Sequence, residues 1–202
     1  MTMTPQQLDA LGELVNIGVG QAAETLNRML ETHVRLEAPH VQFLPLREMM
    51  SVADKLGSGD FAAIRLPFRG VVGGFASLLF PPSDAITIAD LMAGTASATA
   101  DLDAMRIGAL EEVGNIVLNA VMGTMATLLD EHLEYTIPTF VEDSLPRMLH
   151  LETGNPDAHF ILARVTFLLE SHRIEGNFIL YLEMGSVEPL IHILDRFVAR
   201  RK

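Results

Sequence analysis

Apolar residues recur at helical spacing along two stretches of the chain, residues 5–30 and residues 101–129. The stripe in the first stretch consists of Leu8, Leu11, Val15, Val19, Ala22, Leu26 and Leu30. Spacing of three and four residues predicts an amphipathic helix, with Thr4 as its N-cap and Pro5 at its first position. The second stretch has its own stripe and is more apolar in its later half, which we therefore expect to be more deeply covered.

Strand-like segments follow each of these two helices. In the first half they are residues 33–46, 61–68 and 71–80, and in the second half residues 131–141, 160–169 and 176–183. Short closing helices are expected at residues 83–92 and 187–198. Residues 47–55 look like an extra helix in the first half only, because the equivalent residues 144–157 are rich in turn residues and read as a connection.

The two halves share this order residue by residue, at a constant separation of 99 positions and later of 103. We assign the four-residue difference to a longer hairpin loop at residues 171–175, because loops tolerate insertions. The pattern predicts an α+β fold without βαβ alternation. We expect one domain, residues 1–202, built as an internally duplicated, pseudo-two-fold unit with repeats of about 1–98 and 99–202. Each half would be helix–three strands–helix, with the long helices packed on a central antiparallel sheet.

The polar face of each long helix carries a Glu and an Asn three positions apart, and a proline follows 23 positions after each Asn. The two sets are Glu13, Asn16 and Pro39, and Glu112, Asn115 and Pro138. Residues three apart share a helix face, and Asn is unfavourable inside helices, so its presence twice at matched positions is not explained by core packing. An exposed carboxamide can orient a water molecule, and an exposed carboxylate can pair with a partner's cation.

Two plainer interpretations of the Glu/Asn pairs stay open. The four residues could be ordinary solvated positions on amphipathic helices. Alternatively the Asn could cap a neighbouring loop while the Glu pairs with an internal arginine such as Arg65 or Arg164.

The amino-acid composition excludes several classes of partner and of site. The formal net charge is −12, from 14 basic and 26 acidic residues, which disfavours nucleic acid as a partner. The chain has no cysteine, which removes thiolate chemistry and cysteine zinc sites, and its seven histidines are scattered without ligand spacing.

We see no secretory signal, and the uncharged residues 113–129 are short for a membrane span, so we expect a cytoplasmic protein without membrane insertion. Gly18 and Gly20 fit a dinucleotide-binding pattern, but they lie inside a helix.

The motif Asp9-x3-Glu13-x2-Asn16-x22-Pro39 and its copy resemble the signature of the CheC/CheX/FliY family, phosphatases that act on the phosphorylated chemotaxis response regulator CheY. The resemblance covers nearly the whole chain. Two motif copies in about 200 residues are similar to CheC rather than to the single-site CheX, and nothing corresponds to the additional flagellar-switch domain of FliY.

The resemblance implies a catalytic role for Glu13, Asn16, Glu112 and Asn115. The regulator would hold its own Mg²⁺ and aspartyl phosphate, so this chain would need no cofactor or metal. Asn16 or Asn115 would orient the attacking water, and the neighbouring Glu would pair with the regulator's active-site lysine. This is catalysis by positioning. Gly108 stands where the family has Asp or Ser, which predicts an altered second site.

Other interpretations differ in the class of function. The chain could be a non-catalytic adaptor that binds a response regulator or the receptor deamidase CheD, or a fold relative in another two-component pathway. We expect a monomer, because an internal duplication already supplies two-fold symmetry.

Overall fold

The computed structural model describes residues 2–30, 33–38, 40–56, 59–93, 104–153, 158–169 and 172–200. The first half contains α1 (Pro5–Leu30), β1 (Val34–Glu37), β2 (Val41–Pro45), α2 (Leu46–Leu56), β3 (Asp60–Gly70), β4 (Gly74–Phe80) and α3 (Pro82–Ala93). The second half contains α4 (Ala104–Leu129), β5 (Leu133–Tyr135), β6 (Thr139–Ser144), α5 (Leu145–Thr153), β7 (His159–Leu169), β8 (His172–Leu182) and α6 (Val187–Ala199).

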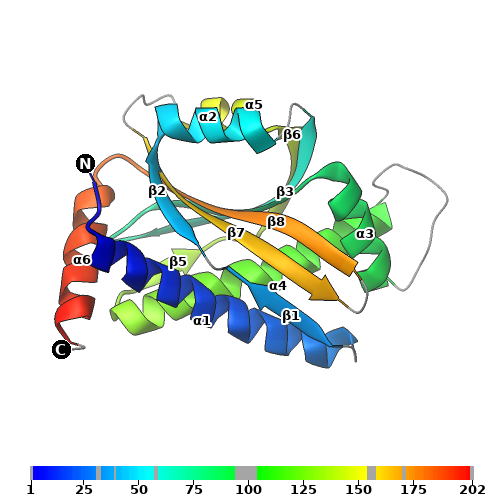
Figure 1. Cartoon of the computed structure of the whole chain (residues 1–202), viewed down its shortest axis with the longest axis horizontal. Coiled ribbons are helices and arrows are strands. Elements are labelled where there is room, and N and C mark those ends of the chain that lie inside the picture. Colours follow the sequence, from blue (N-terminus) through cyan, green and yellow to red (C-terminus); the bar gives the residue numbers. More distant parts are fainter. Residues whose placement is uncertain are drawn as a thin grey trace.

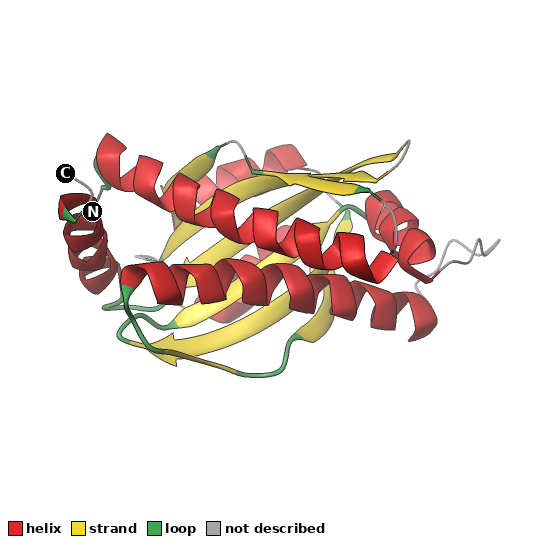
Figure 2. Ribbon diagram, turned by 90° about the horizontal axis from the view of Figure 1, so that it is seen from below, coloured by secondary structure: helices red, strands yellow, loops and turns green. Residues whose placement is uncertain are grey.

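The elements form three layers around one curled antiparallel sheet (Figure 1). The long helices α1 and α4 lie side by side on one face of the sheet, and α2 and α5 cover the other face. The closing helices α3 and α6 lie at opposite ends (Figure 2). The larger apolar core lies between the sheet and α1 and α4, and a second apolar cluster lies beneath α2 and α5. The predicted fold class is confirmed.

The halves exchange strands within the sheet, whose order is β1-β7-β8-β4-β3-β5. β1 and β2 of the first half pair with β7, whereas β5 and β6 of the second half pair with β3. The register keeps the separation of 99, because Val41 pairs with Ala163 and Phe140 pairs with Ile64. The pseudo-two-fold axis therefore passes between the central strands β4 and β8, which pair with each other.

The first helix begins as its sequence predicts. The Thr4 hydroxyl accepts a hydrogen bond from the Gln7 N–H, and the Gln7 side chain accepts one from the Thr4 N–H, which is a capping box. The apolar stripe of α1 faces the core. A Cβ atom added at Gly18 would lie 2.5 Å from the Cα of Val121, so only glycine permits the close crossing of α1 and α4.

The later half of α4 is deeply covered, as expected, with Met122 buried. In the last turn of α4, Leu129 is buried, whereas Leu128 is exposed. The helix α4 is long and apolar enough to cross a membrane. Half of its most apolar stretch is buried inside the structure, however, and core helices of globular proteins are equally long and apolar.

Three details differ from the sequence predictions. Residues 33–46 and residues 131–141 each form two strands instead of one, so each half has four strands instead of the predicted three. Residues 145–153 form a helix, α5, where a connection was expected; Pro146 lies in its first turn, where proline is tolerated. The predicted loop at 171–175 is wrong, because β8 begins at His172 and the four extra residues lengthen that strand to 11 residues, against 7 in β4. Pro39, Ser171 and the expected helix start at Asp101 lie outside the described residues.

Candidate functional site

The first Glu/Asn pair borders an open groove between the N-terminal half of α1 and the start of β2. The groove has a volume of about 600 Å³ and is lined by Leu8, Asp9, Gly12, Glu13, Asn16, Ile17, His40 and Val41. Asp9 and Asn16 are exposed and Glu13 is half-buried. The predicted shared face of Asp9, Glu13 and Asn16 is therefore confirmed, and it faces a cavity large enough for part of a partner molecule.

The carboxamide of Asn16 is held by the chain that follows β1. Its Oδ1 atom accepts a hydrogen bond from the Ala38 N–H at 3.3 Å, while Ala38 itself is buried at 1% exposure. With the oxygen engaged by the protein, the amide NH₂ group is the end that an approaching water or phosphoryl oxygen can use as a donor. The interpretation in which Asn caps a loop is thus correct for Asn16, and it orients the exposed side chain.

A second asparagine on α1 fixes the other end of β1. The Asn27 side chain donates to the Val34 carbonyl at 3.1 Å and accepts from the Val34 N–H. Asn16 and Asn27 together hold β1 against α1 at both ends. The sequence places Asn27 on the polar face of the helix but gives no signal of this role, because its partner lies seven residues later, at the start of the following strand.

The second Glu/Asn pair lies in different surroundings. Glu112 is exposed, and Asn115 is half-buried. The Oδ1 atom of Asn115 accepts a hydrogen bond from the Asn119 side chain, one turn later on α4, instead of from a loop backbone. Gly108, at the position of Asp9, has open space around it. The surroundings of the two Glu/Asn pairs therefore differ, and an altered second site stays a prediction.

The segment after β5 also differs from its counterpart. Ile137, equivalent to Ala38, is 84% exposed and lies in the link between β5 and β6, as does Pro138. A proline here lacks the N–H that would continue the strand ladder. Tyr135, at the end of β5, donates a hydrogen bond from its hydroxyl to the Met122 carbonyl on α4, at 3.1 Å. Burial raises the pKa of this phenol above its ordinary value.

Of the arginines considered as internal partners, Arg65 stacks over the Phe75 ring at 4.3 Å, beneath α2 and α5. Arg164 is exposed in a separate groove of the sheet. Within the described residues, no three His, Cys, Asp or Glu side chains gather as a metal site.

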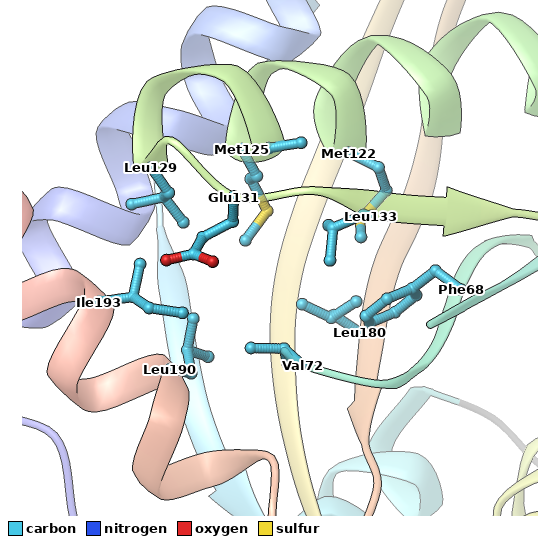
Figure 3. A pocket seen from close by; sticks show the side chains of 11 residues that line it. Phe68, Val72, Met122, Met125, Leu129, Glu131, Leu133, Leu180, Leu190 and Ile193 are labelled. Atoms are coloured by element: carbon cyan, nitrogen blue, oxygen red, sulfur yellow. The ribbon is translucent and has the colours of Figure 1, made fainter. Parts of the chain in front are cut away.

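A separate apolar pocket lies between the end of α4, β5 and α6 (Figure 3). Phe68, Met122, Met125 and Leu190 are among the side chains that line it, and the carboxylate of Glu131 at its rim pairs with Arg196. Its free volume of about 20 Å³ admits no more than about one water molecule. The pocket lies beyond the motif on α4 and contains none of the predicted site residues.

Comparison with known proteins identifies relatives of this chain. Residues 7–42 match the model of the CheC-like family, a segment that includes the first motif. The flagellar motor switch phosphatase FliY of Bacillus subtilis (strain 168) is 26% identical over 138 residues, which span 67% of this chain and 35% of FliY. The CheY-P phosphatase CheC of the same organism is 26% identical over 178 residues, 84% of each protein. The chain thus matches about a third of FliY and most of CheC.

Solved structures share the fold. FliY of Thermotoga maritima superposes with a TM-score of 0.78 at 20% identity, covering all of both chains. FliM in a FliM–SpeE complex from H. pylori gives 0.70 at 12% identity, over 96% of this chain and 97% of the other. A chain of the CheX–CheY–BeF₃–Mg²⁺ complex from Borrelia burgdorferi gives 0.51 at 18% identity, over 82% and 96%. The chain is therefore similar to CheC-type chemotaxis phosphatases in its first motif and along most of its length, and it shares the fold of FliY and FliM.

Proposed function

We propose that this protein is a phosphatase that hydrolyses the aspartyl phosphate of a CheY-type response regulator. The observation that carries the proposal is the exposed carboxamide of Asn16, which the Ala38 N–H orients beside an open groove. The similarity to a CheY-P phosphatase, CheC, over 84% of the chain supports the same substrate class.

The proposed chemistry needs little from this chain beyond positioning. When α1 docks over the regulator's phosphorylated aspartate, the NH₂ group of Asn16 holds a water molecule in line with the bond to be broken. The water oxygen attacks phosphorus, and the bond between phosphorus and the aspartyl oxygen breaks. The aspartate keeps the electron pair as a free carboxylate on the regulator, and inorganic phosphate leaves with the oxygen and the protons of the water. The regulator supplies Mg²⁺, which neutralises the phosphoryl oxygens. Glu13 pairs with the regulator's active-site lysine and fixes the docking angle.

Other parts of this account are also proposals. Glu112 and Asn115 would supply the same chemistry from the second motif wherever a regulator can reach them. The exchanged strands support treating residues 1–202 as one domain made of two repeats. We place the protein in the cytoplasm as a monomer, where it would meet the regulator and, in some pathways, the receptor deamidase CheD.

The test follows the decay of a phosphorylated CheY-type regulator at fixed Mg²⁺, with and without this protein. We expect the wild type to accelerate decay and Asn16→Ala/Asn115→Ala to lose the acceleration by about 100-fold. Glu24→Ala is a matched control, because Glu24 is exposed on α1 beyond the groove. If the double variant accelerates decay as fast as the wild type, the mechanism is wrong.

The alternative function is a non-catalytic adaptor that binds the regulator or CheD. The exposed face of Asp9, Glu13 and Asn16 would serve binding equally well. Tight binding of the regulator without faster decay would favour this second function.

A further inference from the structure

The two motifs also differ at the residue that precedes the glutamate. It is Gly12 in the first copy and Glu111 in the second. A Cβ atom added at Gly12 would lie 3.9 Å from the Cγ2 atom of Val41, so a side chain at this position points across the groove toward the next strand. The absence of a side chain at Gly12 is therefore one reason why the first groove is open.

In the second copy a side chain spans the gap between the motif helix and the next strand. The half-buried Glu111 extends from α4 to β6, where its Oε1 atom accepts a hydrogen bond from the Phe140 N–H at 3.3 Å. Phe140 is the pseudo-two-fold equivalent of Val41, as the strand register confirms. Glu111 therefore bridges the helix and strand whose counterparts in the first copy border the groove.

A second difference between the two copies affects the side chain of Asn115 directly. Position 20 is a glycine with open space around it, whereas the equivalent Asn119 carries a side chain that donates to the Asn115 oxygen. The segment after β5 lacks the contacts that hold its counterpart, since Ile137 is 84% exposed and Ala126 stands in place of Asn27. The carboxamide of Asn115 is thus directed by its own helix and not by the segment after β5.

We propose that Glu111 closes the second motif, so that this protein engages one regulator at a time through the Glu13/Asn16 groove. This inference rests on the proposed phosphatase function. It makes Gly12 and Glu111 the specificity-determining pair for the two sites: glycine leaves the helix-to-strand gap open for a docked partner, and glutamate fills it.

One test closes the first groove. Gly12→Glu introduces the bridge that the second copy has, and we expect it to lower the rate of dephosphorylation by about tenfold or more. Gly12→Ala adds only a methyl group at an ordinary contact distance and should lose less. Gly123→Glu is the matched control, because it makes the same change of charge and size in open space on α4.

The reciprocal test opens the second groove. In an Asn16→Ala background, Glu111→Ala combined with Asn119→Gly should raise the residual rate by about tenfold, and adding Asn115→Ala should remove the gain. Both opening changes only delete side-chain atoms, from the half-buried Glu111 and the exposed Asn119, so this test holds even if Gly12→Glu fails to fold. An unchanged rate in the opened variant would overturn the proposal.

Binding stoichiometry gives a readout that does not depend on catalysis. Calorimetry with a CheY-type regulator carrying beryllofluoride and Mg²⁺ should give one regulator per wild-type chain and two per Glu111→Ala/Asn119→Gly chain. Two regulators per wild-type chain would overturn the proposal while leaving the phosphatase function intact. If the wild type binds one regulator but does not accelerate decay, the phosphatase function fails and the one-site binding stands. Absence of any binding would overturn both.

Discussion

The Asn16 side-chain oxygen accepts the Ala38 N–H at 3.3 Å, and this bond joins the motif helix to the end of the strand that follows it. The equivalent pair, Asn115 and Ile137, both within the described part of the chain, makes no such bond, because Asn115 turns to Asn119 and Ile137 points into solvent. Two copies of one motif have thus become structurally unequal. The difference comes from the residues around each Glu/Asn pair and not from the pair itself.

Asn16→Asp separates orientation of the side chain from its chemistry. An aspartate can still accept the Ala38 N–H, but it has no NH₂ donor and brings negative charge toward the regulator's phosphate. We expect dephosphorylation to fall by about 100-fold while the free energy of unfolding changes by less than about 1 kcal/mol. Rate measurements combined with urea denaturation check this. Retention of most activity by Asn16→Asp would mean that the carboxamide does not position the water through its NH₂ group.

The crossing of α1 and α4 at Gly18 should tolerate no larger residue. Gly18→Ala places a methyl group 2.5 Å from the Val121 Cα, so the helices must separate, and we expect a loss of about 2 kcal/mol in the free energy of unfolding. Gly20→Ala is the matched control, because Gly20 has open space around it and alanine favours a helix by about 0.5–1 kcal/mol. Denaturant midpoints should therefore shift in opposite directions, and a stabilised Gly18→Ala would contradict the packing described.

The ion pair between α3 and α4 should matter more than those on the surface. Arg106 is 2% exposed and binds both carboxylate oxygens of Asp90, at 2.7 and 3.0 Å. Asp90→Asn removes the charge of this carboxylate from the buried guanidinium and weakens two charge-assisted hydrogen bonds, which we expect to cost about 2 kcal/mol. Asp130→Asn, in an exposed pair with Arg200, should cost less than about 1 kcal/mol. Thermal or chemical unfolding of the two variants measures the contrast, which would disappear if the buried pair contributed nothing.

The raised pKa of Tyr135 predicts a loss of stability at alkaline pH. Burial favours the neutral phenol, so the native protein holds this proton more tightly than the unfolded chain. As pH rises through and above about 10, the unfolded state releases the proton first and the free energy of unfolding falls. Tyr135→Phe removes this contribution, so its stability should depend less steeply on pH than that of the wild type in urea titrations between pH about 9 and about 11. Equal slopes would contradict the assignment.

Local patterns in the sequence predicted local structure well. The apolar stripe and the Thr4-Pro5 start gave α1 its observed limits, because helix periodicity and capping depend on neighbouring residues. The helix α5 was missed because Pro146 and the turn residues after it resemble a loop unless the proline is recognised as part of a first turn. The exchange of β1 and β5 between halves depends on pairing between distant strands, for which a single sequence has no signal.

The sequence predicted which helix face Glu13 and Asn16 share, but it did not predict the groove beside them. The spacing of Glu13 and Asn16 placed them on one face, which the structure confirms. The importance of Gly12 and Glu111 could be recognised only once the structure showed which strand each position faces. Aligning the two halves does reveal the glycine-to-glutamate change, which together with Gly108 could have indicated unequal grooves.

The most direct test of the central claim uses a phosphorylated CheY-type regulator in excess over this protein, so that each chain must act repeatedly. We predict that the decay rate rises in proportion to the concentration of wild-type chain, and that Asn16→Ala/Asn115→Ala still binds the regulator but does not accelerate its decay. Equal acceleration by the wild type and the double variant would contradict the claim that these asparagines position the attacking water.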